Sequence, residues 1–541
     1  MKSTTLTAAA ATTAAALSSF FLPTSSFSYN IPFCLAAINA PGSVTHPNIV
    51  YFLVDDMGFA DCAFNHGKDV FTPNIDALSR KGVILENYYV QPLCSATRCT
   101  LMTGRMPNRH GVYGALKTES RYGLPLDERI LPQLLKTAGY TSAIVGKWHC
   151  GEYKPEYRPM HRGWDHQYGL WYGQIDYFTH FRGGREDWYR DDQPLHEKGY
   201  STHLIGQEAI RLIKEHAAAT TANGAAAPKV MGASSSLTRE QDAPATLAGA
   251  AAPTVNREPE TVNRGGSAAA PLFLYIPFNA DHGPFQVPAE YEKPYPNLKP
   301  DRRRVAGMLS VVDEVIGKVY KALQDAGMAD NTLIIFSSDN GGVAPGVRTD
   351  NSPLRDGKGS IYEGGVRSCG FVIWPGHITP GTKVSAPVQL VDWYPTFAAL
   401  TGADLSTQKK KLDGQNILPL LTEGKAPDRD ALLIVGTSIQ RYALRMGDWK
   451  LLVNPKGPGK GGAKGGDPDD ADDTEVITND HLELYNLATD IGEKHNLADA
   501  EPARLKAMYA RAKAMMSDAV PNLATTSGSK AATKAGKGKR K

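Results

Sequence analysis

The chain has 541 residues, 42% hydrophobic and 21% charged, a composition typical of a globular protein rather than a fibrous or disordered one. A chain of this length is too long for one ordinary hydrophobic core. Two or more domains, or one large α/β domain with an appendage, are therefore expected. A formal net charge of +3 gives no ground for a polyanionic partner such as nucleic acid.

The N-terminal region is expected to be a leader and linker over residues 1–46. The first 54 residues contain neither Asp nor Glu, and Lys2 is their only Lys or Arg. An apolar stretch within 6–22 fits a secretory signal peptide, with an organellar transit segment as the alternative. No later stretch is apolar for long enough to span a bilayer. The sequence therefore predicts a secreted or lumenal, lysosome-like location.

Apolar, β-rich runs alternate with helical patterns from residue 48 onwards. Buried strands are expected at 48–54, 140–145, 271–278, 332–336 and 370–374. Helices are expected between them at 74–81, 131–138, 203–216 and 303–326. Strands alternating with helices predict an α/β fold with a large, mainly parallel sheet flanked by helices. Functional sites of such sheets lie at the carboxyl ends of the strands.

The expected domain organisation is a large domain at 47–424 followed by a smaller α+β domain at 425–519. Residues 217–270 are mostly Ala, Gly, Ser, Thr and Pro and predict a low-complexity insert in the large domain. The smaller domain should contain an antiparallel sheet and a Gly-, Lys- and Asp-rich loop at 455–479. Residues 520–541 are expected to form a basic, disordered tail.

Cys94 opens the most informative segment, CSATRCTLMTGR at 94–105. It stands at a loop-to-helix boundary, and Arg98 follows one helical turn later. A helix N-terminus and a nearby cation both favour negative charge on the sulfur. A lone cysteine is more often a buried structural residue. Whether Cys94 is functional must therefore be judged from the residues expected to lie near it. The cysteines expected to be buried thiols are Cys62, Cys99, Cys150 and Cys369.

Carboxylates end two of the expected strands. Asp55 and Asp56 follow the strand 48–54, and Asp339 and Asn340 follow the strand 332–336 within SSDNGG. Each pair alone also makes a good polar turn. Together they form an all-oxygen ligand set at one sheet edge, which suits Ca²⁺ better than Zn²⁺.

Basic side chains occur in the loops after other strands. They are Lys147 and His149 of GKWH, His282 of DHGP, and Lys358 of GKG. Any one of them would more often be a surface or satisfied core residue. A ring of such groups around a cation would instead suit a dianionic or sulfate-like group.

Several segments resemble, in this order, the sulfatase family of the alkaline-phosphatase-like superfamily. They are TPNIDAL (72–78), CxxxR…TGR (94–105), GKWH (146–149), RGWD (162–165), SSDNGG (337–342), YEGGVR (362–367) and YNLATDIGEKHNLA (485–498). The resemblance runs from about residue 47 to 497 and is nearest to the arylsulfatase B, or N-acetylgalactosamine-4-sulfatase-like, branch. It implies an alkaline-phosphatase-like fold with 47–424 as the catalytic domain.

The resemblance also implies a modified nucleophile. A formylglycine-generating enzyme would convert Cys94 to Cα-formylglycine, whose hydrated aldehyde, a gem-diol, attacks the sulfur of the ester. One Ca²⁺ would be held by Asp55, Asp56, Asp339, Asn340 and the modified Cys94. Arg98 and His149 would stabilise and deprotonate the diol. The sulfate would be gripped by Lys147, His282 and Lys358, with His282 or Lys358 assisting the leaving oxygen.

Three residues depart from the family's usual pattern around the nucleophile. Ala96 stands where Pro is usual, Thr97 where Ser is usual, and Cys99 directly follows Arg98. These departures bear on whether Cys94 is converted, and a disulfide at Cys99 would interfere with that conversion.

The function expected from the sequence is sulfuric ester hydrolysis on a sulfated sugar or an aryl sulfate. A 4-sulfated N-acetylgalactosamine is one candidate substrate, and other sulfated polysaccharides are equally open. One alternative is a phosphate- or phosphonate-ester hydrolase of the same superfamily, which the single-cation ligand set disfavours. Another is an inactive sulfated-glycan-binding relative, which would follow if Cys94 stays a thiol.

Overall fold

Strand β1 (Asn48–Val54) lies inside a ten-stranded sheet of order β14-β2-β13-β11-β1-β10-β4-β5-β8-β9 in the computed structural model, which describes residues 46–118, 120–225, 270–456 and 475–527. The other strands are β2 (Val83–Leu85), β4 (Thr141–Val145), β5 (His166–Gly169), β8 (Tyr189–Arg190), β9 (Gln193–Pro194), β10 (Leu272–Pro277), β11 (Thr332–Ser338), β13 (Gly370–Ile373) and β14 (Thr382–Val384). The central strands β11, β1, β10, β4 and β5 run parallel, whereas β13 is antiparallel to β11.

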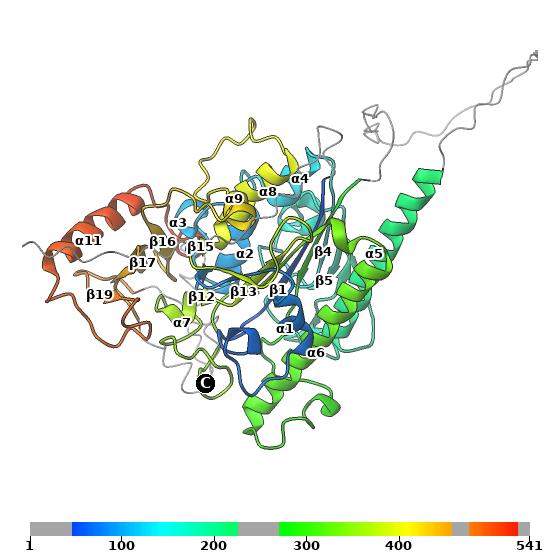
Figure 1. Ribbon diagram of the computed structural model, residues 1–541, viewed down its shortest axis with the longest axis horizontal. Helices are drawn as coiled ribbons and strands as arrows, with labels where there is room; N and C mark the ends of the chain where they lie inside the picture. Colours follow the sequence, from blue (N-terminus) through cyan, green and yellow to red (C-terminus); the bar gives the residue numbers. More distant parts are fainter. Residues whose placement is uncertain (1–45, 119, 226–269, 457–474, 528–541) are drawn as a thin grey trace, which may run out of the picture. The chain divides into compact units, whose positions relative to one another are not determined.

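Both faces of the sheet are covered because β1 is apolar throughout and strand side chains alternate between faces. Val50, Phe52 and Val54 belong to one core cluster with helices α1 (Pro73–Ser79), α5 (Ser201–Ala225) and α6 (Pro300–Asp325). Ile49, Tyr51 and Leu53 belong to a second cluster with α2 (Cys94–Thr103), α4 (Leu131–Lys136) and α8 (Trp393–Thr401). Helices α5 and α6 lie side by side (Figure 1).

The remaining elements are short or belong to the C-terminal part. The short helices are α3 (Pro107–His110), α7 (Glu363–Val366), α9 (Leu418–Glu423) and α12 (Leu523–Ser527). A three-stranded sheet joins β12 (Arg367–Ser368), β3 (Tyr88–Tyr89) and β15 (Val388–Gln389), and a hairpin joins β6 (Phe181–Arg182) to β7 (Arg185–Glu186). No helix among the described residues is both long and apolar enough to cross a membrane.

The predicted fold class is confirmed, and the predicted strands and central helices are present within a few residues. Helix α5 continues to Ala225, into the segment expected to be a low-complexity insert, because its Ala-rich extension favours helix. Residues 520–527 are not a free tail: the Val520 N–H donates to the Asn108 carbonyl at 2.9 Å, and Tyr113 donates to the Val520 carbonyl at 2.7 Å.

Several predictions fall outside the described residues. They concern the leader at 1–45, most of the insert (226–269), most of the loop (457–474) and the basic tail from 528.

The C-terminal part contains the expected antiparallel sheet. Its strands are β16 (Leu432–Val435), β17 (Tyr442–Met446), β18 (Trp449–Val453) and β19 (Leu482–Asn486), and α11 (Pro502–Met516) packs against it. A buried charge cluster ties this sheet to the large sheet's domain. Lys450 Nζ lies 2.8 Å from Glu363 Oε1 and 3.0 Å from Glu493 Oε1, and all three side chains are excluded from solvent.

Lys450→Met is expected to lower the free energy of unfolding by about 3–5 kcal/mol, because it leaves two buried carboxylates without their shared cation. Urea unfolding followed by circular dichroism measures the change. Lys506→Met, at an exposed position of α11, is the matched control and should change stability little. Equal stability of the two variants would contradict this view of the cluster.

Candidate active site

The strand-end carboxylates meet because β1 and β11 are parallel neighbours, with Val54 paired to Ser338. Asp55 and Asp339 are the next residues on each strand. The Asp56 N–H donates to Asp339 Oδ1 at 3.2 Å, and Asn340 Nδ2 donates to Asp56 Oδ1 at 2.7 Å. The four predicted ligand residues that follow these strands are therefore gathered at one edge of the sheet, and all are buried.

Helix α2 brings Cys94 and Arg98 to this edge. Cys94 is its first residue, and Arg98 follows one turn later on the same face. One Arg98 nitrogen lies 2.8 Å from Asp339 Oδ2 and 3.6 Å from Asp55 Oδ2. Burial opposes the charge of Arg98, but Asp339 raises its pKa above the ordinary value. The first turn of α2 therefore brings its arginine into the cluster of carboxylates.

Two lysines approach the carboxylates from different loops. Lys147 Nζ lies 2.5 Å from Asp55 Oδ2, and Lys358 Nζ lies 2.9 Å from Asp56 Oδ2. Burial opposes the charge of Lys147, but Asp55 raises its pKa above the ordinary value. The Lys147 ammonium group thus stays positive at the base of the site.

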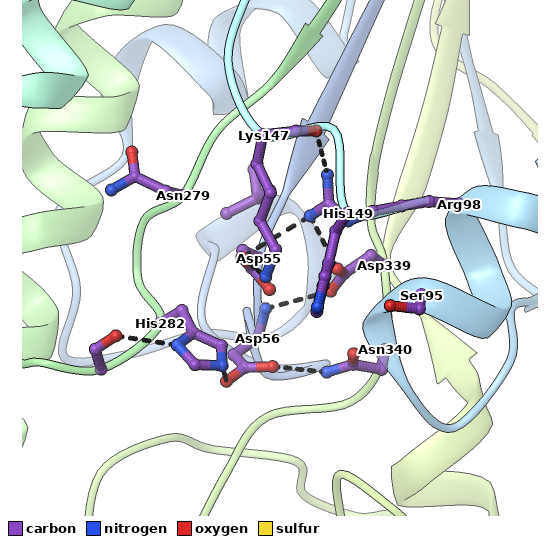
Figure 2. A network of polar contacts seen from close by, with 12 residues as sticks. Asp55, Asp56, Ser95, Arg98, Lys147, His149, Asn279, His282, Asp339 and Asn340 are labelled. Atoms are coloured by element: carbon purple, nitrogen blue, oxygen red, sulfur yellow. Dashed lines mark hydrogen bonds and ion pairs between the residues drawn. The ribbon is translucent and has the colours of Figure 1, made fainter. Parts of the chain in front are cut away.

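Two histidines complete the group. His282 Nε2 lies 3.8 Å from Asp56 Oδ2, and its Nδ1 donates to the Gly283 carbonyl at 2.8 Å. His149 Nε2 donates to the Leu116 carbonyl at 2.9 Å. Figure 2 shows Lys147 pointing toward Asp55, and Asp56 lying between His282 and Asn340. The structure therefore brings the predicted basic residues to the same edge as the carboxylates.

The cluster of carboxylates at the two strand ends has the properties of a cation site. Asp55 Oδ1 and Asn340 Oδ1 are buried, and neither has a hydrogen-bond partner among the described residues. Burial and the neighbouring Asp339 raise the pKa of Asp55 to about 7, against the opposing effect of Lys147. Asp55, Asp56 and His282 also offer ligand atoms within 4.8 Å of one another. Clustered oxygen atoms lacking partners fit a hard divalent cation such as Ca²⁺.

Comparison with known proteins identifies the family of this chain. Residues 47–403 match the family described as Sulfatase. The chain belongs to the sulfatase family. Arylsulfatase J of Mus musculus is 31% identical over 513 residues, which cover 88% of this chain and 77% of that protein. N-acetylgalactosamine-6-sulfatase of Homo sapiens is 31% identical over 435 residues, covering 75% of this chain and 72% of that protein.

A solved structure is similar as well. It is the crystal structure of Ps i-CgsB in complex with k-i-k-neocarrahexaose, with a TM-score of 0.70 and 30% sequence identity, and the match covers 88% of this chain and 94% of that chain. The predicted sulfatase family and its fold are thus confirmed. The nearness to the arylsulfatase B branch stays a prediction, since the relatives above carry other names.

The sulfatase's departures from the usual nucleophile segment are accommodated locally. The Thr97 hydroxyl accepts from the Gln91 N–H at 3.0 Å and lies 3.1 Å from the Gln91 carbonyl, so it closes the turn before Cys94. Cys99 is buried in the same apolar core as Cys150. Burial raises the pKa of Cys99 well above its ordinary value, as for an inert structural thiol.

The loop 171–187 is a part of the site that the sequence analysis missed. The His149 N–H donates to the Trp171 carbonyl at 3.0 Å, and a Cβ at Gly173 would lie 2.6 Å from His149 Cε1. Further along, the Tyr177 hydroxyl donates to the His282 carbonyl at 2.7 Å. The loop therefore spans both histidines. These contacts were not predictable from the sequence, because an irregular loop has no periodicity to reveal them.

Proposed function

We propose that this sulfatase hydrolyses a sulfate ester of a sugar, using Ca²⁺ and a formylglycine made from Cys94. The observation that carries the proposal is the place of Cys94, at the first turn of α2 beside Arg98, where the carboxylates of two strand ends meet Lys147. A nucleophile made from this cysteine would therefore stand close to both the proposed cation ligands and the basic side chains.

Ca²⁺ and formylglycine would supply different chemistry. Asp55, Asp56, Asp339 and Asn340 would hold Ca²⁺, which when bound neutralises charge on the sulfate. Formylglycine supplies an oxygen nucleophile with a built-in route for releasing sulfate. A formylglycine-generating enzyme is then a required partner.

The chain's own side chains bind the sulfate and move protons. Lys147 and Lys358 lie where they can neutralise non-bridging oxygens, and their fixed positions make that stabilisation available without reorganisation. The His149 ring is oriented by its hydrogen bond to the Leu116 carbonyl, which makes Nδ1 the basic nitrogen of the neutral ring. We assign proton removal at residue 94 to His149 and proton delivery to the leaving oxygen to His282 or Lys358.

The substrate class is supported by the relatives. Two of them are named for sulfated aryl or amino-sugar substrates, and the crystal structure of Ps i-CgsB contains a carrageenan-type hexaose. The arylsulfatase B likeness of the sequence favours a 4-sulfated N-acetylgalactosamine unit. A secreted or lumenal location accords with such a substrate.

The test is turnover of an aryl sulfate and the matching aryl phosphate by protein co-expressed with a formylglycine-generating enzyme. Released sulfate and phosphate are measured by ion chromatography. Sulfate release should dominate and should require Ca²⁺. Dominant phosphate release would instead favour the ester hydrolases of phosphate or phosphonate, and no release from fully converted protein would favour a glycan-binding relative.

Gly173→Ala is expected to lower kcat about a hundredfold while the fold is retained, because the added Cβ would push the His149 ring out of place. Gly114→Ala is the matched control, since a Cβ there meets nothing within 4 Å, and its kcat should match that of the unmodified sequence. Steady-state kinetics with circular dichroism spectra measure both. Equal kcat for the two variants would contradict the positioning of His149 by the loop 171–187.

A further inference from the structure

A band of arginines and aromatic rings borders the catalytic residues on the side of His149. We call it the rim and define it by Arg121, Tyr153, Tyr172, Phe181 and Arg185. Tyr172 lies between Trp171 and Gly173, which both contact His149, and Tyr153 lies four residues after His149. The rim is thus connected through the chain to the residues that hold His149.

Arg185 is held in place yet remains half exposed. Its guanidinium donates to the Tyr172 hydroxyl at 2.9 Å and lies 5.4 Å from the centre of that ring. The Glu152 carboxylate lies 3.5 Å away, and 55% of the Arg185 side chain is still exposed. An arginine fixed on an aromatic ring loses little rotamer freedom when it binds an anion.

A second arginine and two exposed rings widen the rim. Arg121, which is exposed, lies 5.8 Å from the ring centre of Tyr153. Tyr153 is 49% exposed, and Phe181, on the hairpin that carries Arg185, is 44% exposed. Flat rings beside fixed cations suit a sugar face that carries anionic substituents.

We propose that the rim binds a further sulfated sugar of an extended oligosaccharide while the catalytic residues hold the sulfate that is cleaved. This rests on the proposed function and deepens it, because it assigns an oligosaccharide rather than a single sugar as substrate. Arg185 and Arg121 donate to the oxygens of the second sulfate, as guanidinium groups do toward tetrahedral anions. Tyr153 and Phe181 pack against sugar C–H faces.

The test compares the double variant Arg121→Ala/Arg185→Ala with Arg504→Ala. Arg504 is a matched control in the C-terminal part: its guanidinium lies 4.1 Å from the Trp449 ring centre and 3.4 Å from Glu501, and its side chain is 43% exposed. Each protein is assayed with 4-nitrophenyl sulfate and with chondroitin 4-sulfate and iota-carrageenan hexasaccharides. For affinity, Cys94→Ala is added to each of these proteins, and the same hexasaccharides are titrated into them by calorimetry.

The double variant should lose about tenfold in hexasaccharide affinity per arginine, and its kcat/KM for a hexasaccharide should fall relative to that for 4-nitrophenyl sulfate. Arg504→Ala should change neither quantity. Two results would overturn the proposal that the rim binds a second sulfated sugar. One is equal affinity of the double variant and Arg504→Ala, and the other is that neither hexasaccharide binds to the starting protein. Failure of converted protein to hydrolyse 4-nitrophenyl sulfate overturns the proposed function separately, since the calorimetric result does not depend on turnover.

Discussion

Cys94→Ala is expected to lower kcat for an aryl sulfate by about 10⁴-fold or more, because it removes the residue from which the nucleophile is made. The fold should persist, since Cys94 is one small side chain at the start of α2. Turnover is measured on protein co-expressed with a formylglycine-generating enzyme, and circular dichroism checks the fold.

Cys99→Ala provides the control within the same helix. Cys99 is equally buried but packs in the apolar core against Cys150, so this variant should keep its turnover and lose only a little stability. Comparable loss of turnover in the two variants would mean that the helix, not residue 94, is what activity requires.

Asp339→Asn is expected to lower turnover at least a hundredfold and to weaken Ca²⁺ binding. The change keeps the size of the side chain but removes the charge that pairs with Arg98 at 2.8 Å. Arg98 and Lys147 hold the pKa of Asp339 below its ordinary value despite burial, so the carboxylate is charged in the native protein. Turnover against Ca²⁺ concentration, starting from chelator-treated protein, measures the effect.

Asp392→Asn is the matched control for this change. Asp392 is also fully buried and paired with an arginine, Arg429, but it lies at the start of α8. Both variants should lose stability, because each removes the charge of a buried carboxylate that pairs with an arginine. Only Asp339→Asn should need more Ca²⁺, and full activity of Asp339→Asn in chelator would contradict the metal assignment.

The meeting of the strand-end carboxylates was predictable because each strand and the carboxylates that follow it are adjacent in the sequence. A continuous apolar, β-rich run followed by Asp55 and Asp56 predicts a buried strand that ends in polar groups, and the same holds for Asp339 after β11. Neighbouring parallel strands then place those ends together. The partner of each carboxylate was not predictable: Lys358 reaches Asp56 from a loop more than 300 residues away, through contacts that no periodicity records.

Other features of the fold and the site were not predicted from the sequence, for different physical reasons. Strand direction is not encoded in a short apolar run, so β13 gave no sign that it runs antiparallel to β11. The Ala-rich end of α5 has no periodic apolar face, although alanine favours helix on its own. The contacts of Tyr177 and Gly173 depend on an irregular loop, whose path is set by tertiary packing.

Peptide mass spectrometry across residues 91–105, on protein from its own host, shows directly whether Cys94 becomes formylglycine. We expect residue 94 to have lost the mass that corresponds to replacing a cysteine thiol by a formylglycine aldehyde, while Cys99 in the same peptide remains unmodified. An intact thiol at Cys94 in active protein would contradict the formylglycine mechanism.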